Sequence, residues 1–447
     1  MILANKLSAR EHTVRILDEF ERSSERLSAI FNNYFATNDT SSKSRPEITH
    51  LVQDIVRHRG YIDHIINSLF RGNYETADNI LRNTLRLGTY EIIYRDHVPD
   101  FAAVNEAVEI AKRKRGKGAA GLTNALLRKV READASIEKE LSPEAPIQQT
   151  ATLLSHPGWM VRRWIDSFGW ERTIQLCEWN NTVPILTVRM NSLRTEKEAF
   201  EKFMKESMVK WEPNQILSEF YTVQQVSKIK ASRQFGEGHF SFQDVSSGLV
   251  VNLLKPTEGD TVLDVCAAPG GKCCYMAELM RNSGLVHAFD VDADRIELLK
   301  ESVERLRLNS VQVEQKNATV DSFPISGKIL IDAPCTGTGV MAKRADLKWR
   351  RRLSDLDKMV TLQKRIISHT AQFLGPEGEL VYATCSVEPE ENWGVTDSFL
   401  ADNPSFSTLS AEGRVPPEFL DVRGALSTFP SEHGTDGVFA VILRRNS

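Results

Sequence analysis

Two cysteines stand directly after apolar runs that are typical of buried strands. Cys335 ends the segment KILIDAPC, and Cys385 ends the segment ELVYATC. A thiol in such a place is a core residue, a metal ligand, half of a disulfide, or a nucleophile with a helper. Neither cysteine has a second ligand at the C-x-x-C or H-x-x-x-H spacing of a zinc site, so no metal site is expected.

The cysteine pattern also bears on the cellular compartment. The six cysteines match no disulfide framework of secreted proteins, and the segment MILANKLSARE meets charge too early for a signal-peptide core. No apolar run approaches the ~20 residues that span a bilayer. These features predict a cytoplasmic chain without a membrane partner, in which a permanent disulfide is not expected.

A small-residue loop precedes both cysteines in the chain. The segment TVLDVCAAPGGKCCYMAELM predicts a strand, a turn and a helix, whose N-terminus leaves room for a ligand. It contains neither G-x-G-x-x-G nor the G-K-[ST] ending of a phosphate-binding loop. About twenty residues on, the segment LVHAFDVDADR predicts a strand ending at Asp290, whose carboxylate suits ribose hydroxyls. The loop and Asp290 together predict a nucleoside cofactor, and a dinucleotide is an alternative ligand. The competing interpretation is a plain tight turn with an exposed Asp that binds no ligand.

These residues need a parallel sheet to bring them together. From about residue 240, apolar strands alternate with amphipathic helices, which predicts an α/β Rossmann-like domain with a mostly parallel sheet. The carboxyl ends of parallel strands face one ligand crevice, so both thiols are expected beside the small-residue loop. Plain burial is the competing explanation for each thiol.

The first part of the chain has a different pattern. Apolar residues recur at three- and four-residue steps up to about residue 135, which predicts an all-α bundle. A run without any acid follows one of these helices. Its basic residues are Lys112, Arg113, Lys114, Arg115, Lys117, Arg128, Lys129 and Arg131. The run is either a solvated helix end with a flexible loop or a patch that binds phosphates.

The chain of 447 residues is long enough for several domains, and its net charge of −4 restricts any nucleic-acid surface to a local patch. The acidic, proline-containing stretch READASIEKELSPEAPIQQ predicts a linker. The expected domains are a helical domain, a linker, a small α+β middle region and a catalytic domain. Their boundaries are 1–135, 136–150, 151–237 and 238–447.

The helical segment carries a resemblance to a known family. The strings NILRNTLRLGTYEIIY, VPDFAAVNEAVEIAKR and GLTNALLRKV resemble the helical RNA-binding domain of the NusB antitermination-factor type. The resemblance covers about 130 residues and implies a bundle that binds structured RNA. It favours RNA contact by Lys112, Arg113, Lys114, Arg115, Lys117 and Arg128.

A second resemblance covers residues 150 to 445. The segments CAAPGGK, DAPCTGTGV and YATCSVEPEEN resemble the three signature segments of the S-adenosylmethionine-dependent RNA cytosine-5 methyltransferases. QDVSSGLVV and HGTDGVFAVIL resemble segments that flank them. With a NusB-like domain in front, the order of domains implies small-subunit (16S) ribosomal RNA as the substrate, protein-free or in an early assembly intermediate. S-adenosyl-L-homocysteine would be the second product, and the chain is expected to be a monomer.

This resemblance assigns roles that agree with the chemistry of the base. Carbon 5 of cytosine attacks a methyl donor only after a thiolate has added to carbon 6. The resemblance implies that Cys385 is this nucleophile, that Cys335 helps to break the adduct, and that Asp332 hydrogen-bonds the base near N3. The cofactor residues that it implies are Cys266, Ala267, Ala268, Pro269, Gly270, Gly271, Lys272, Asp290, Asn317 and Asp332. Asn317 stands where the family usually has an acid, which leaves an amide for the adenine edge.

A second basic cluster, KRADLKWRRR, follows Cys335 in the chain. It is either a solvated helix face or a contact to the substrate backbone, and the RNA contact is expected from Lys343, Arg344, Lys348 and Arg350. Two other functions remain as alternatives: a cytosine-5 methyltransferase of transfer RNA, and a ribosome-assembly factor that binds RNA without catalysis. Methyl transfer to each RNA, with product analysis, discriminates among them.

Overall fold

The computed structural model describes residues 7–446, whose internal contacts divide them into two compact units. The first unit contains residues up to 182 together with 341–351. The second contains residues 183–340 and those from 352 onward.

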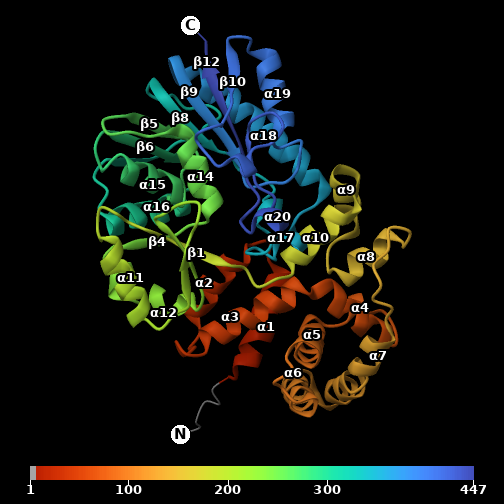
Figure 1. Cartoon of the computed structure of the whole chain (residues 1–447). Coiled ribbons are helices and arrows are strands. Elements are labelled where there is room, and N and C mark those ends of the chain that lie inside the picture. The colour runs from red at the N-terminus through yellow and green to blue at the C-terminus, as the bar shows by residue number, and fades with distance from the viewer. Residues whose placement is uncertain (1–6, 447) are drawn as a thin grey trace. The chain divides into compact units, whose positions relative to one another are not determined.

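The first unit is helical, as the periodicity predicts. Its helices bury the apolar residues that recur at three- and four-residue steps, among them Ile48, Leu51 and Ile55. Helix α1 begins with a capping box in which Ser8 Oγ accepts from Glu11 N and the Glu11 carboxylate accepts from Ser8 N. The helices, coloured red to yellow in Figure 1, are α1 (Ala9–Arg22), α2 (Leu27–Thr37), α3 (Arg45–Arg57), α4 (Arg59–Leu69), α5 (Asn79–Tyr94), α6 (Asp100–Leu127), α7 (Val130–Ser136), α8 (Ile147–Leu153), α9 (Gly158–Phe168) and α10 (Trp170–Asn180).

The first unit extends beyond the expected boundary at residue 135. Helix α8 packs against α4, and a segment from much later in the chain, 341–351 with helix α17 (Leu347–Arg350), belongs to the same unit. Residues 151–182 of the expected middle region are therefore part of the helical unit. Periodicity along the chain predicts each helix but does not say which helices share a core.

The second unit contains a small antiparallel sheet in the order β2-β3-β1-β4. Its strands are β1 (Leu186–Met190), β2 (Trp211–Pro213), β3 (Phe220–Val223) and β4 (Phe240–Phe242), with helices α11 (Lys197–Glu206), α12 (Val226–Lys230) and α13 (Arg233–Gly236). Val188, Tyr221 and Phe240 of the sheet form one apolar core with Phe200 of α11. Because β4 belongs to this sheet, the small sheet ends a few residues beyond the expected boundary at 237.

The larger sheet has the strand order β10-β12-β9-β8-β5-β6-β7, and β11 also pairs with β12. Strands β5 to β9 run parallel, and β10, β11 and β12 pair antiparallel, so the predicted mostly parallel α/β fold is confirmed. The strands are β5 (Thr261–Asp264), β6 (Leu285–Asp290), β7 (Val311–Gln315), β8 (Ser326–Asp332), β9 (Leu374–Thr384), β10 (Phe406–Leu409), β11 (Leu426–Ser427) and β12 (Phe439–Arg445). The helices of this part are α14 (Val245–Leu254), α15 (Gly271–Leu279), α16 (Ala293–Leu306), α18 (Leu353–Thr370), α19 (Trp393–Asp402) and α20 (Pro430–His433).

The strand order reverses between β5 and β8. The chain moves from β5 outward to β6 and β7, then returns to place β8 on the other side of β5 and β9 beyond it. In open parallel sheets, ligands bind outside the carboxyl ends of the strands at this kind of reversal. The fold therefore predicts a site beyond the ends of β5 and β8.

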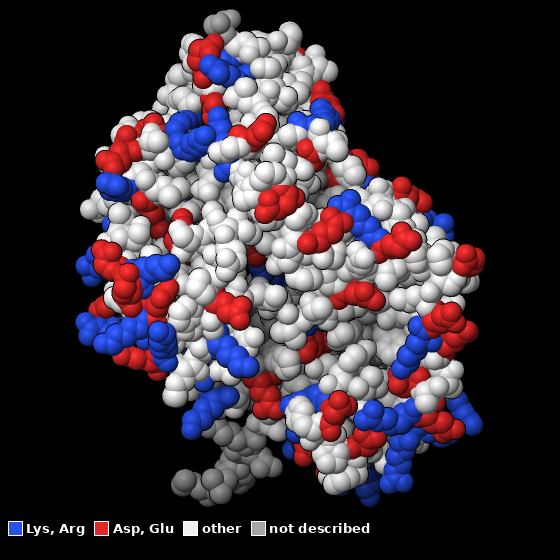
Figure 2. All heavy atoms as spheres, in the orientation of Figure 1, with Lys and Arg blue, Asp and Glu red and all other residues white. Residues whose placement is uncertain are grey.

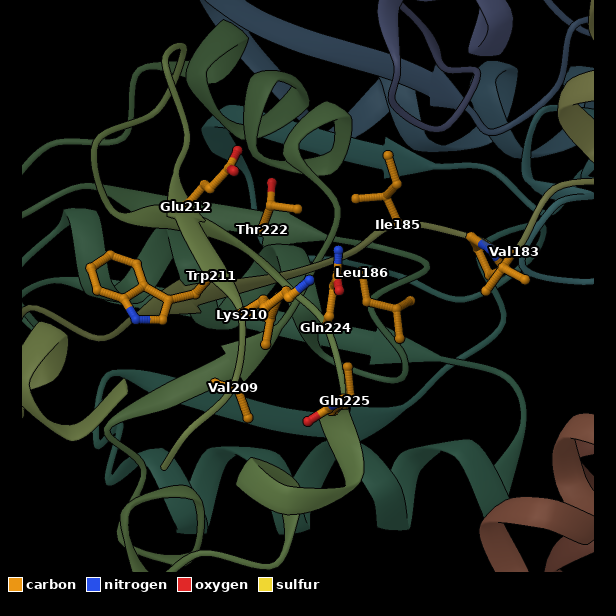
Figure 3. A pocket seen from close by; sticks show the side chains of 13 residues that line it. Val183, Ile185, Leu186, Val209, Lys210, Trp211, Glu212, Thr222, Gln224 and Gln225 are labelled. Carbon is orange, nitrogen blue, oxygen red and sulfur yellow. The ribbon is translucent and has the colours of Figure 1, made fainter. Parts of the chain in front are cut away.

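Neither the surface charge nor the pocket on the small sheet points to the site expected beyond the ends of β5 and β8. On the face seen in Figure 2, Lys and Arg alternate with Asp and Glu, in agreement with the small net charge. A pocket of about 970 Å³ lies on the small sheet, where Ile185, Trp211 and Thr222 are among its lining residues (Figure 3). Its lining includes none of the predicted catalytic or cofactor residues. Among the described residues, no helix is long and apolar enough to cross a membrane.

Candidate active site

The two cysteines lie side by side in the structure. Cys335 Sγ and Cys385 Sγ are 3.3 Å apart, although fifty residues separate them in the chain. Strands β8 and β9 pair in parallel with Asp332 opposite Ala383, so the loops that follow them start at the same height. Gly339 N donates to Cys385 O at 3.1 Å, which joins the two loops further on. Both thiols are partly exposed, and the two cysteines form no disulfide.

Asp332 and Lys272 add a charged pair beside the thiols. Lys272 Nζ donates to Asp332 Oδ2 at 2.7 Å, and the Asp332 side chain keeps about a third of its surface exposed. Burial acts to lower the pKa of Lys272, but the negative charge of Asp332 outweighs it, so that pKa is raised and the ammonium keeps its charge. The charged Lys272 side chain therefore holds the Asp332 side chain in place.

The surroundings of Cys335 raise the pKa of its thiol. Its hydrogen bond with Cys385, its burial and the nearby charge of Glu391 together raise the pKa of Cys335 well above that of an ordinary thiol. Cys335 is therefore a neutral thiol at neutral pH in the resting protein.

The small-residue loop lies between β5 and α15, as the sequence predicts. Gly270 has φ +109°, a left-handed conformation that suits glycine, and a Cβ there would meet Leu299 at 2.7 Å. Ala267 N donates to Phe289 O at 2.8 Å, which holds the loop against the end of β6. Ala267 and Ala268 are buried, Cys266 and Lys272 are half-buried, and Pro269 and Gly271 are exposed. The exposed part of the loop is the turn into the helix.

Asp290 ends β6 and contacts this loop directly. Its carboxylate accepts hydrogen bonds from Ala268 N at 3.2 Å and Asp292 N at 3.1 Å. It also forms an ion pair with Arg295 at 3.2 Å. The side chain is almost fully buried, so it supports the loop in addition to the ribose contact expected of it.

Asn317 lies two residues beyond β7, in a tight local turn. Its Oδ1 accepts from Thr319 N at 3.0 Å and from Thr319 Oγ1 at 2.8 Å. Its backbone N–H donates to Asp321 at 2.7 Å. The side-chain carbonyl oxygen is therefore engaged within the turn. The predicted contact to the adenine of the cofactor then depends on the side-chain amide nitrogen.

Three acidic or basic residues near the site escaped the sequence interpretation. Asp264 ends β5 and is fully buried, and neither of its oxygens has a hydrogen-bond partner among the described residues. Burial and the charge of Asp332 raise its pKa to about 8 against the opposing effect of Lys272. In the sequence, Asp264 could have been recognised by its position at the end of a strand, just before the small-residue loop. Glu391 and Arg189 are also fully buried, and only their spatial neighbours reveal what they do.

The basic residues expected to contact RNA fall into two groups. In the first unit, Lys112, Arg113, Arg115, Lys117 and Arg128 are exposed and Lys114 is half-buried, all on or next to α6. Arg115 forms an ion pair with Asp78 at 2.6 Å. Gly116, in the middle of this run, has φ +85° and interrupts the helix, so the run is neither a regular helix end nor an open loop.

The cluster after Cys335 is different from the expected exposed face. Lys348 is fully buried and donates to Arg57 O at 3.2 Å and to Asn181 Oδ1, and its burial lowers its pKa well below that of an exposed lysine. The Arg350 guanidinium donates to the carbonyls of Phe20 and Ser23. These two residues hold the helical unit together, so the expectation of RNA contact is corrected for them. Lys343 and Arg344 are half-buried.

Comparison with known proteins agrees with this arrangement. Three family models match in order along the chain: the NusB family at residues 7–132, the ferredoxin-like domain of RsmF/B-like methyltransferases at 156–229, and 16S rRNA methyltransferase RsmB/F at 251–444. The ferredoxin-like match begins among helices that here pack with the first unit.

Relatives and solved structures extend the likeness to the whole chain. A probable ribosomal RNA small subunit methyltransferase B of Bacillus subtilis is 31% identical over 98% of this chain and 99% of its own. A ribosomal RNA small subunit methyltransferase B of Vibrio cholerae is 28% identical over 90% of each chain. The crystal structure of the protein PH0851 matches 99% of this chain and 100% of its own with a TM-score of 0.81 and 25% identity. A methyltransferase homologue from Pyrococcus horikoshii matches 68% of this chain and 100% of its own with a TM-score of 0.58 and 28% identity. A chain with this domain order, these signature loops and this full-length similarity belongs to the RsmB/F family of 16S ribosomal RNA methyltransferases.

Proposed function

We propose that the protein methylates carbon 5 of a cytosine in small-subunit ribosomal RNA, through a covalent bond between Cys385 and carbon 6 of the base. The observation that carries the proposal is the pair of thiols 3.3 Å apart beside the Asp332 carboxylate, at the carboxyl ends of neighbouring parallel strands. One sulfur is needed to attack the base and a second group is needed to release it.

The residues around the small-residue loop fit S-adenosyl-L-methionine. Asp264 has two buried oxygens without a hydrogen-bond partner among the described residues, which suits a polar ligand at the end of β5. Residues 266–272 and Asp290 would hold the methionine and ribose parts, and the Asn317 amide nitrogen would reach the adenine edge. When bound, this cofactor supplies an electrophilic methyl group on its sulfonium sulfur. Asp332 would lie at the border between the cofactor and the base.

The protein's own groups then perform the covalent chemistry. The Cys385 thiolate forms a bond to carbon 6 of cytosine while N3 takes up a proton through Asp332, so that the ring accepts the electron pair; the same proton leaves N3 when the adduct breaks. Carbon 5 would then become nucleophilic and take the methyl group as its bond to the sulfonium sulfur breaks, with S-adenosyl-L-homocysteine as the leaving group. Removal of the proton from carbon 5 returns the electron pair to the ring, and the bond from carbon 6 to Cys385 breaks. The target base must leave its stack to reach a thiol in this crevice.

The hydrogen bond between the thiols in the resting protein suggests why Cys335 acts only after Cys385 has bonded to the base. The hydrogen bond to Cys385 is the first cause of the raised pKa of Cys335. Once Cys385 is bonded to the base, its sulfur is a neutral thioether, and the hydrogen bond between the two thiols no longer exists. The pKa of Cys335 falls at that moment, which makes its thiolate available as the base that removes the proton from carbon 5.

Separate replacement of the two cysteines tests these roles. Cys385→Ala is expected to abolish methyl transfer and to form no protein–RNA adduct. Cys335→Ala is expected to accumulate an adduct that survives a denaturing gel, because attack proceeds and release does not. Loss of attack in Cys335→Ala with activity retained in Cys385→Ala would contradict the assignment.

The substrate is tested with labelled S-adenosyl-L-methionine, protein-free small-subunit ribosomal RNA and transfer RNA. Digestion of the product is expected to yield 5-methylcytosine from the ribosomal RNA alone. Label in transfer RNA alone would overturn the substrate and leave the chemistry intact. Label at another base or another atom of cytosine would overturn the chemistry.

A further inference from the structure

Glu391 lies six residues after Cys385, in the short segment between β9 and α19, and its side chain is fully buried. Its Oε1 accepts hydrogen bonds from Thr336 N at 2.8 Å and from Gln363 Nε2 at 2.9 Å. Its Oε2 accepts from the hydroxyls of Thr336 and Ser386. One carboxylate thus contacts the residue that follows each catalytic cysteine.

The rest of the network extends the same two loops. Gln363 Nε2 also donates to Pro334 O at 2.9 Å, on the other side of Cys335. Thr338 Oγ1 lies 3.1 Å from Ser386 Oγ and accepts from Val387 N at 3.1 Å. The loop after β8 is therefore tied to the loop after β9 at several points, and the Glu391 carboxylate is the acceptor they share.

A buried carboxylate costs several kcal/mol unless its lone pairs are satisfied, and an apolar residue would fill the same volume without that cost. Here four donors from three side chains and one backbone group meet it. Such an acceptor fixes the directions of its donors, which a methyl group does not. A carboxylate at this point is therefore suited to hold two loops at a defined separation.

We propose that Glu391 is a positioning residue that holds Cys335 and Cys385 at the separation required for attack on the base and release of the product. The inference rests on the proposed function, because it explains how the two thiols of that mechanism are kept together. Glu391 touches neither sulfur through a hydrogen bond and acts through Thr336 and Ser386.

The charge of Glu391 has a second consequence for the same pair. It is one of the groups that raise the pKa of Cys335, after the hydrogen bond to Cys385 and burial. The residue that sets the separation therefore also favours the neutral thiol of Cys335. Removal of the charge should move the titration of Cys335 toward lower pH.

The test compares Glu391→Gln with Glu390→Gln. Glu390 is an exposed neighbour in the same segment, so its replacement removes the same charge without the buried contacts. The first readout is the rate at which diamide joins the two thiols, with both thiol hydrogens passing to diamide and mass spectrometry identifying the linked peptides. Loss of the shared acceptor leaves buried donors mispaired, so linkage in Glu391→Gln is expected to slow by roughly tenfold or more.

The second readout is alkylation of Cys335 by iodoacetamide against pH, in a Cys385→Ala background that removes the competing thiol. Glu391→Gln is expected to shift the profile to lower pH, and Glu390→Gln is not. Equal linkage rates and equal pH profiles for the two variants would overturn the inference. If Glu391→Gln does not fold, Thr336→Val removes one tie between the loops and is expected to slow linkage in the same direction; an unchanged rate would overturn it.

These readouts need no RNA, so they separate this inference from the proposed function. Changed thiol readouts together with a fall in kcat at unchanged KM support the positioning role. If the thiol readouts change but methyl transfer does not, the thiol separation set by Glu391 is not required for catalysis, and the inference is overturned. Full activity of Cys385→Ala would instead overturn the proposed function, whatever the Glu391 variants show.

Discussion

The buried ion pair between Arg189 and Glu278 allows a sharp test of how the cofactor helix is held. Arg189, in β1, donates to the two Glu278 carboxylate oxygens at 3.0 and 2.7 Å and to Gly271 O at 3.2 Å. Its guanidinium also donates to Gln243 Oε1 and lies 4.5 Å from the ring centre of Tyr275. One side chain of the small sheet thus supports both the first and the last turn of α15.

Arg189→Met removes the cation and leaves the Glu278 carboxylate buried. Because only about 3% of the Glu278 side chain is exposed, solvent does not compensate, and the expected loss is about 3–5 kcal/mol. The double variant Arg189→Met with Glu278→Met removes both charges and is expected to lie within about 1–2 kcal/mol of the wild type. The double variant should therefore be more stable than the single one.

The same pair predicts a pH dependence in the single variant. Burial already raises the pKa of Glu278, and Arg189 opposes that shift. Without Arg189 the folded-state pKa rises further above its unfolded value, so the folded state binds the extra proton. The stability of Arg189→Met is therefore highest at low pH and is lost as pH rises through the raised pKa.

Hydrogen exchange of peptides covering residues 261–280 is the suitable assay, because a chain with two units does not define one global unfolding free energy. A loss of 3–5 kcal/mol corresponds to exchange that is roughly a hundredfold faster or more. Arg281→Met is the matched control, since its ion pair with Glu258 is exposed and should contribute no more than about 1 kcal/mol. An Arg189→Met variant that exchanges like this control, or a double variant no better than the single one, would refute the reasoning.

Three further predictions follow from buried groups and close contacts. Lys348→Met is expected to leave the salt dependence of RNA binding unchanged because Lys348 is buried, whereas Lys117→Met is expected to reduce the slope of log affinity against log salt by about 0.7–0.9; equal slopes in filter-binding titrations would contradict this. Asp264 has a folded pKa of about 8, above its unfolded value, so the wild type should lose about 2 kcal/mol between pH 6 and pH 8. Asp264→Asn should remove most of that dependence in exchange measurements on the cofactor-free protein, and an unchanged dependence would assign it to other groups. Gly339→Ala would press a Cβ against the Gly437 carbonyl, so methyl transfer should fall at least tenfold with little change at the helical unit, and normal kinetics would show that the loop yields.

Local order along the chain was predictable. The helical periodicity before residue 135 and the alternation of strands and helices after 240 both correspond to observed elements, because each depends on residues three or four positions apart, or on short runs. The small-residue loop and Asp290 were recognisable for the same reason, since a strand, a turn and a helix are consecutive. The expectation that strand ends share one crevice correctly predicted that Cys335 and Cys385 lie together.

The tertiary structure alone decided what surrounds these elements. Lys348 looks like part of an exposed basic run in the sequence, yet it is buried because its helix packs with a unit formed from residues nearly three hundred positions away. Glu391 looks like one acid among several at a helix start, but its partners include Thr336, in the loop after β8 and 55 residues earlier, and Gln363, in α18 and 28 residues earlier. The sequence by itself determined the elements, the family and which side chains are candidates for the chemistry, because those depend on residue type and short spacing. Burial, the 3.3 Å thiol separation and the direction of each pKa shift depend on residues distant in the chain, and only the folded structure brings those residues into contact.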